Sequence, residues 1–331
     1  MCWRSLLGAF QLIVVRLRVD ASIHEFVRCS MASIPHPIPY QGSKRLLAPL
    51  ILEHFPEQVH TLYEPFAGSG ALSLAAAARH KAKRYVLGDS LTELIDVWNW
   101  ILDQPVRLAD DYQRLWERQH DDPVAFYNAV RDEYNELGGP ARLLFLLARC
   151  VKNSVRFNRH GEFNQSPDKR RLGTAPERMR KNVLGAHDLL TGKTQALSAD
   201  YSSLLALATP SDLVYMDPPY QGTSGSRDQR YYQQLDLERF IEELAALRSR
   251  GVPFIISFDG RSGTKTYGPN LPKFLNLTRL EIHAGRSAQA TLNGADDETY
   301  ESLYLSPELS KRMRDTKISV SGVLEQPTFN F

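Results

Sequence analysis

Apolar runs of strand length recur along the chain, and the stretches between them carry apolar residues at helical spacing. The runs lie at 61–65, 85–89, 194–199, 213–217 and 254–258. Strands that alternate with helices are typical of a parallel sheet covered by helices. Two last runs, 277–284 and 302–306, are joined by a polar stretch without helical spacing, and they are predicted to pair antiparallel. The pattern therefore predicts an α/β fold with a largely parallel sheet.

The spacing between the second and third runs predicts an insertion. About a hundred residues separate these runs, far more than one crossover helix needs. We expect a mainly helical second domain at 93–193, inserted into a sheet domain formed by 31–92 and 194–310, with 311–331 as a tail. The first half of the insertion, 93–137, has helical spacing and an acidic composition, and the second half opens with an apolar helix at 141–151.

Charge is concentrated in the second half of this insertion. The whole chain of 331 residues has a net charge of only +2, and its apolar share of 43% can fill a large core. Between Arg142 and Lys193, however, twelve basic and four acidic residues give a net charge of +8. A solvated surface usually mixes both signs more evenly. The stretch therefore predicts a cationic face suited to nucleic-acid phosphates.

Cysteine and histidine usage excludes some classes of protein. Cys2, Cys29 and Cys150 have no spacing that indicates a disulfide framework or a metal site. The nine histidines form no pairing typical of metal ligands, so no metal is expected. A reducing cytoplasm is the natural setting for such a chain.

The N-terminal segment does not continue the fold pattern. Its apolar run, 6–15, is too short to span a bilayer, and Arg16 and Arg18 follow it where a signal peptide would have small residues. We interpret residues 1–30 as an upstream extension without function, with Met31 as the functional start. A variant that begins at Met31 is expected to fold and to keep its activity.

Asp217-Pro218-Pro219-Tyr220 follows the apolar run 213–216. Neither proline can donate to a sheet ladder, so the run ends in a rigid turn. An exocyclic amine could donate to the Asp217 carboxylate and the Pro218 carbonyl while its flat ring stacks on Tyr220. The tetrapeptide thus indicates chemistry on a nucleobase amino group, and an ordinary turn is the alternative.

A second motif, Glu64-Pro65-Phe66-Ala67-Gly68-Ser69-Gly70, joins a predicted strand to the alanine-rich helix 71–78. A Gly-x-Gly turn lets a ligand approach the backbone at the carboxyl edge of a sheet. Ser73 stands where a dinucleotide fingerprint has its third glycine, and no phosphate-loop lysine follows. A nucleotide-like cofactor without a pyrophosphate is predicted, with Asp89, at the end of the next strand, accepting from a ribose hydroxyl.

These two motifs, together with Tyr40-Gln41-Gly42-Ser43-Lys44, resemble in their order the D12 class of adenine-specific DNA methyltransferases. The resemblance covers residues 36 to about 306. It implies a Rossmann-like, seven-stranded sheet that binds S-adenosyl-L-methionine, and an inserted domain that recognises the DNA target. The cofactor residues implied or predicted here are Tyr40, Lys44, Glu64, Phe66, Ala67, Gly68, Gly70, Asp89, Asp200 and Asp217.

Two of these positions have an alternative reading. Lys44 could be a loop lysine that leads into a helix. Asp200 resembles the acidic residue that accepts from the adenine amine of the cofactor, but it could equally be the N-cap of a helix at 202–205.

The segment 152–171 alternates cations, amides and aromatic residues, as contacts to phosphates and base edges require. The D12 class is the family of the bacterial Dam methylases, and portions 156–158 and 161–164 match the corresponding stretch of that family. Residues 151–154 depart from it, so the resemblance does not imply that the target is GATC. Tyr231, Tyr232 and Phe240 are candidates to wall the extruded base, although such aromatics are more often core, and Ser287 is a candidate DNA contact. The other predicted DNA contacts are Lys152, Asn153, Arg156, Asn158, Arg159, Asn164, Lys169, Arg170, Arg171 and Arg286.

The reaction implied is methyl transfer to the N6 amine of an adenine swung out of duplex DNA, with Asp217, Pro218, Pro219 and Tyr220 as the catalytic residues. A monomer without membrane attachment is expected. Both stand-alone methylation and restriction-modification with a cognate endonuclease fit the sequence. The alternatives are an N4-cytosine DNA methyltransferase, an RNA or protein-amide methyltransferase, and a DNA-binding protein without catalysis. An N4-cytosine methyltransferase usually has Ser, and a protein-amide methyltransferase usually has Asn, in place of Asp217.

Overall fold

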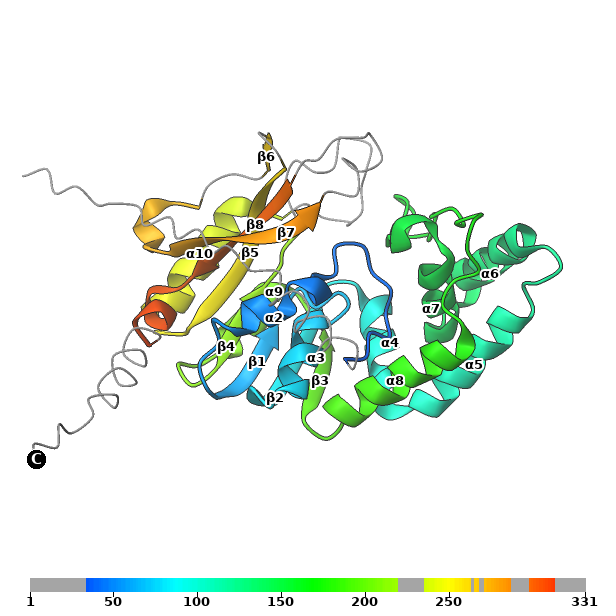
Figure 1. Cartoon of the computed structure of the whole chain (residues 1–331), viewed down its shortest axis with the longest axis horizontal. Coiled ribbons are helices and arrows are strands. Elements are labelled where there is room, and N and C mark those ends of the chain that lie inside the picture. The colour runs from blue at the N-terminus through cyan, green and yellow to red at the C-terminus, as the bar shows by residue number, and fades with distance from the viewer. Residues whose placement is uncertain (1–33, 220–234, 263–264, 268–270, 287–297, 313–331) are drawn as a thin grey trace, which may run out of the picture.

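A computed structural model describes residues 34–219, 235–262, 265–267, 271–286 and 298–312 (Figure 1). The predictions for residues 1–30, Tyr220, Tyr231, Tyr232, Ser287 and most of the tail lie outside these residues. Within them, no helix combines the length and the apolar character that crossing a bilayer requires.

A single sheet has the strand order β3-β2-β1-β4-β5-β8-β7. Strands β3, β2, β1, β4 and β5 are parallel, and β8 pairs antiparallel with both β5 and β7. The parallel sheet and its final antiparallel pair are therefore confirmed. The strands are β1 Val59–Glu64, β2 Ala82–Asp89, β3 Thr194–Ser198, β4 Leu213–Met216, β5 Phe254–Ser262, β6 Lys265–Tyr267, β7 Thr278–Arg286 and β8 Glu298–Leu305.

Three features of the sheet differ from the sequence prediction. Strand β6 was not predicted, and it pairs with the far end of β5 off the main path. Strands β5 and β8 extend to Ser262 and back to Glu298, several residues beyond the predicted apolar runs. The extensions are polar residues that pair with each other, so pairing rather than apolar content defines these ends.

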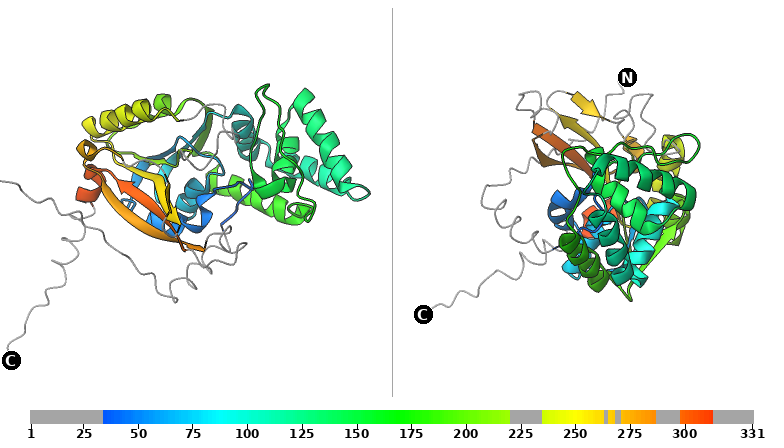
Figure 2. Two further views of the ribbon diagram at one scale, coloured as in Figure 1. Left: turned by 90° about the horizontal axis from the view of Figure 1, so that it is seen from above. Right: turned by 90° about the vertical axis from the view of Figure 1, so that its right-hand side faces the viewer.

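Helices cover both faces of the sheet. One core cluster joins α2 (Ala48–Leu52) and α3 (Ala71–Ala78) to one face, and a second joins α9 (Tyr201–Leu207) and α10 (Leu237–Ser249) to the other. The short helix η1 (Lys44–Leu46) precedes α2. Figure 2 shows α10 lying along its face of the sheet. A short turn, η3 (Lys273–Leu275), precedes β7.

The chain between β2 and β3 forms helices, as predicted. They are α4 Thr92–Asp103, α5 Pro105–Glu117, α6 Pro123–Leu137, α7 Pro140–Arg149, η2 Val151–Asn153 and α8 Pro176–Leu190. Figure 1 shows α5, α6 and α7 gathered beyond the β3 edge of the sheet. Trp98, Phe145 and Met179 from these helices share one apolar cluster with Leu62 and Tyr85 of the sheet. The helical part is therefore packed against the sheet through a continuous core.

Candidate active site

The loop after β1 is organised around a buried carboxylate. Glu64 is 4% exposed, and its Oε2 accepts from the Ser73 backbone nitrogen at 3.0 Å and from Ser73 Oγ at 2.5 Å. Glu64 therefore satisfies the N-terminus of α3, where a phosphate loop would bind phosphate. Ser73, which departs from the dinucleotide fingerprint, is the partner that makes this possible. Burial raises the pKa of Glu64 to about 7, against the opposing effect of the Ser73 hydrogen bonds.

The glycines of this loop have backbone conformations and surroundings that exclude a side chain. Gly68 and Gly70 have φ values of +49° and +57°. A Cβ atom on Gly70 would lie 2.6 Å from Trp98 Cζ2, and one on Gly68 would lie 3.2 Å from Tyr40 Cε1. Trp98 Nε1 also donates to the Gly68 carbonyl at 3.0 Å. Trp98 therefore packs against Gly70 and holds the Gly68 carbonyl, while the Tyr40 ring covers Gly68.

Asp89 ends β2 and holds the same loop from the next strand. It is 5% exposed, and its two carboxylate oxygens accept from the backbone nitrogens of Gly68 and Leu91, each at 3.0 Å. Burial raises the pKa of Asp89, although these hydrogen bonds lower it. The residue predicted to bind a ribose therefore also fixes the glycine turn.

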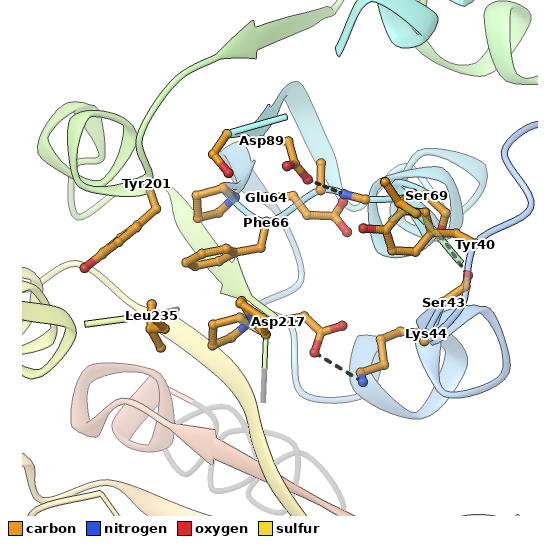
Figure 3. A pocket seen from close by; sticks show the side chains of 18 of the residues that line it. Tyr40, Ser43, Lys44, Glu64, Phe66, Ser69, Asp89, Tyr201, Asp217 and Leu235 are labelled. Carbon is orange, nitrogen blue, oxygen red and sulfur yellow. Dashed lines mark hydrogen bonds and ion pairs between the residues drawn. The ribbon is translucent and has the colours of Figure 1, made fainter. Parts of the chain in front are cut away.

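Asp217 follows β4 and forms an ion pair with the N-terminal motif. Lys44 Nζ lies 3.2 Å from Asp217 Oδ1 (Figure 3) and 3.1 Å from Glu301 Oε2. Lys44 is only 7% exposed, so this cation is buried between two carboxylates. Glu301 lies on β8, and the sequence did not predict it as a site residue.

These residues surround one cavity of about 440 Å³ at the carboxyl edge of β1, β2 and β4. The strand order changes direction between β1 and β4, which is where open α/β sheets bind ligands. Figure 3 shows Glu64, Asp89 and Asp217 around this space. All predicted cofactor residues except Gly70 line the cavity, as do Pro218 and Pro219. Lining residues that sequence reasoning missed include Tyr201, Leu235, Asp236 and Arg239.

Asp200 serves as a helix cap and also lines the cavity. Its Oδ1 accepts from the Ser202 backbone nitrogen at 3.0 Å, which caps α9, and Arg239 Nη2 lies 2.7 Å away. Burial raises the pKa of Asp200, but the Ser202 hydrogen bonds and the Arg239 charge outweigh it, and the pKa is lowered. Tyr201 stacks on Phe66 with ring centroids 5.2 Å apart. The N-cap reading is confirmed, and the same residue lines the cavity.

Phe240 belongs to the core. Its side chain is fully buried, and it packs against Phe258 with ring centroids 5.9 Å apart. It does not line the cavity, so the core alternative holds for Phe240.

Residues 156–164 form a small hairpin beyond α7. Phe157 and Phe163 form a β-bridge, and their rings pack edge to face with centroids 5.6 Å apart. Asn158 Oδ1 accepts from the backbone nitrogens of His160 and Glu162, so this side chain shapes the turn. Arg159 is exposed at the tip, and Asn164 is exposed at the open end of the hairpin, where its backbone nitrogen donates to the Arg156 carbonyl at 3.1 Å.

Asn153 connects the helical part to the N-terminal motif. Its Nδ2 donates to the Leu147 carbonyl at 2.8 Å, and its own carbonyl accepts from the Gln41 backbone nitrogen at 2.9 Å. Lys152 and Asn153 both have positive φ, 62° and 52°, which is rare for residues other than glycine. Ser154 and Val155 then line the cavity. The predicted recognition segment therefore begins at the candidate active site.

The cationic stretch is partly neutralised within the fold. Arg149 is 1% exposed and donates to the Asp168 carbonyl at 2.8 Å. Arg170 and Arg171 pair with the Asp168 carboxylate, and hydrogen bonds from Arg170 lower the pKa of Asp168 to about 2. In the part of the chain that the structure describes, Lys152, Arg156 and Lys169 form no ion pair. Arg286 ends β7, and its side chain lies outside the described residues.

A comparison with protein families defines the class of protein. The family model for D12 class N6 adenine-specific DNA methyltransferases matches residues 40–277. The match covers well over half of the chain, so the chain belongs to this family, as the resemblance predicted.

Individual relatives agree with this class. The modification methylase StsI of Streptococcus sanguinis is 30% identical over 207 residues, 58% of this chain and 30% of that protein. The type II methyltransferase M1.LlaDCHI of Lactococcus lactis subsp. cremoris is 24% identical over 277 residues, 77% of this chain and 90% of that protein. A DNA adenine methylase of Salmonella typhimurium is 28% identical over 235 residues, 66% of this chain and 78% of that protein. The chain spans about a third of StsI but most of the other two.

Proposed function

We propose that this protein transfers a methyl group from S-adenosylmethionine to the N6 amine of an adenine that has swung out of duplex DNA. The observation that carries the proposal is the meeting of three separate motifs in one cavity. Lys44, Glu64 and Asp217 come from three distant segments, and all three line it. All three lie within residues 40–277, which match the family model.

The residues present fit this cofactor. Tyr40, Gly68 and Asp89 all line the cavity, so the glycine turn and the carboxylate that ends the next strand face the same space. Asp89 would accept from the ribose hydroxyls and Asp200 from the adenine amine, while the stacked pair of Phe66 and Tyr201 would offer an aromatic surface to the flat ring. When bound there, S-adenosylmethionine supplies an electrophilic methyl group.

Asp217 and Pro218 would activate the adenine amine. The N6 lone pair is delocalised into the ring, so it attacks poorly until two acceptors draw the amine toward a tetrahedral geometry. The Asp217 carboxylate and the Pro218 carbonyl are these acceptors, held by the rigid prolines at the end of β4. Tyr220, the proposed stacking partner of the base, lies outside the described residues.

The helical part at 93–193 would recognise the DNA target. The exposed cations Lys152, Arg159 and Lys169 lie in or next to the loops that lead away from the cavity, where they could contact phosphates. Asn153 and Asn158 have internal partners, so we assign them to shaping these loops rather than to base contacts. Asn164, at the hairpin, is the amide proposed to reach a base edge.

The test is transfer of a labelled methyl group to duplex DNA, followed by digestion and identification of the modified nucleoside. The proposal predicts N6-methyladenine from the wild-type chain and none from the Asp217→Ala variant. N4-methylcytosine as the product, or methylation of RNA alone, would contradict it.

The assembly and the biological setting are part of the proposal. We propose a monomer, which light scattering of the protein with and without DNA would show. A role in host protection predicts that the methylated site resists one specific endonuclease, whereas a stand-alone methylase needs no such partner.

A further inference from the structure

Glu301 is a charged group at the edge of the candidate active site that the proposed reaction does not use. Its Oε2 lies 3.1 Å from Lys44 Nζ, and the same ammonium lies 3.2 Å from Asp217 Oδ1. Lys44 is 7% exposed, and the Glu301 side chain is 21% exposed. Two carboxylates therefore share one buried cation.

The register of β8 explains why Glu301 faces Lys44. Side chains alternate along a strand, so Glu301 shares its face with Leu303 and Leu305. Both leucines belong to the same apolar cluster as Leu47, which follows Lys44 by three positions. Strand β8 is paired on both sides at Glu301, with β5 and with β7, so the carboxylate is held on a rigid element.

The charges of the three groups bear on the strength of Asp217 as an acceptor. If Asp217 were the only counterion of a buried ammonium, the two charges would neutralise each other. The adenine amine would then have to compete with Lys44 for the same carboxylate oxygen. A second carboxylate draws part of the ammonium's charge away and leaves a net negative charge near Asp217.

We propose that Glu301 is a positioning residue, which holds the Lys44 ammonium so that the Asp217 carboxylate can accept hydrogen bonds from the adenine amine. The inference rests on the proposed methyl transfer, and it assigns a role to a strand that the sequence motifs do not include. Glu301 acts only through Lys44, so its effect disappears when Lys44 is absent.

The experiment is a double-mutant cycle on the full chain, measured as the single-turnover rate of DNA methylation at saturating cofactor. Glu301→Gln is expected to slow the rate about tenfold, because the buried ammonium loses the carboxylate that it shares with Asp217. In the Lys44→Met background the same change is expected to cost nothing further. Cofactor affinity is expected to be the same in Glu301→Gln and in the wild type.

Glu281→Gln is the matched control. Glu281 lies on the neighbouring strand β7 with a side-chain exposure of 18%, and it forms an ion pair with Arg279. Removing its charge is expected to leave the rate near that of the wild type. Should Glu301→Gln melt below the assay temperature, Glu301→Asp keeps the charge and is expected to retain more activity than Glu301→Ala at equal stability.

Equal fold-losses from Glu301→Gln with and without Lys44 would overturn the proposal, as would a wild-type rate in Glu301→Gln. If Glu301→Asp and Glu301→Ala are compared instead, equal methylation rates for these two variants would also overturn the proposal. The proposed function fails separately, because a wild-type chain that methylates no DNA contradicts it before any variant is compared.

Discussion

The carboxyl edge of the sheet and the loops of the helical part hold their charged side chains in opposite ways. At the sheet edge, Lys44, Glu64 and Asp89 are each less than one tenth exposed and have fixed partners. In the segment after α7, Lys152, Arg159 and Lys169 point into solvent. Chemistry on a weakly nucleophilic amine needs groups that are already in place, whereas phosphate attraction acts at a distance and tolerates motion. Changes at the edge should therefore affect rate or stability, and changes in the loops should affect DNA affinity.

Asp217→Ala should have the largest effect. It removes one of the two proposed acceptors of the adenine amine, so the rate of methyl transfer is expected to fall by about a thousandfold or more. Cofactor affinity, measured by calorimetry, should remain within a few-fold of the wild type because Glu64, Asp89 and the glycine turn are intact. Substantial residual turnover in Asp217→Ala would refute the role assigned to this carboxylate.

Glu64 should make stability depend on pH. Burial raises the pKa of Glu64 from 4.5 in the unfolded chain to about 7, so the folded state keeps a proton that the unfolded state loses. Its stabilising contribution is full below pH 4.5 and is lost as the pH rises through 7. Between pH 5 and 8, the unfolding free energy of the wild type should fall by about 3 kcal/mol relative to Glu64→Gln. Denaturant unfolding at several pH values checks this, with Glu57→Gln at the exposed surface as the control; parallel curves for wild type and Glu64→Gln would count against it.

Gly70→Ala tests the rigidity of the same edge. The added Cβ would lie 2.6 Å from Trp98, and the residue has a positive φ, so the loop or the indole must shift. We expect a loss of about 2 kcal/mol in stability together with weaker cofactor binding. Gly192→Ala, which also has a positive φ but no atom within 4 Å of the added carbon, separates backbone strain from the clash. Similar losses of cofactor affinity in both variants would show that the contact with Trp98 does not matter.

The double variant Lys152→Ala/Lys169→Ala should have the smallest effect, on DNA affinity alone. The Kd for duplex DNA is expected to rise about tenfold, and the slope of log Kd against log salt to decrease by about 2. Lys83→Ala, on an exposed lysine at the start of β2, removes the same kind of charge from the opposite edge of the sheet. If the slope of log Kd against log salt is unchanged in the double variant, Lys152 and Lys169 do not contact the DNA phosphates.

The difference between the two regions also explains how far the sequence predicts the structure. Asp89 and Asp217 stand at the ends of apolar runs, and the carboxyl ends of parallel strands meet at one edge, so their proximity follows from local signals. Glu301 and Arg239 reach the site through strand register and helix packing, which no local signal in the sequence reveals. The net charge of +8 in the insertion counts Arg149 and the partners of Asp168, which the fold uses internally.

Ser73 is a second residue whose role the sequence alone does not reveal. It looks like a departure from a known fingerprint, and its role becomes apparent only when Glu64 is placed 3.0 Å from its backbone nitrogen. Strand β6 has too few apolar residues to be recognised, since it is defined by pairing with the polar end of β5.

The central claim is that the cavity at the carboxyl edge methylates adenine N6 in DNA. The most direct test is modification-aware, single-molecule sequencing of DNA from cells that express the wild-type chain or the Asp217→Ala variant. The account predicts N6-methyladenine within one sequence context in the first sample and its absence in the second. Unmodified DNA in both samples, or methylation confined to cytosine, would contradict it.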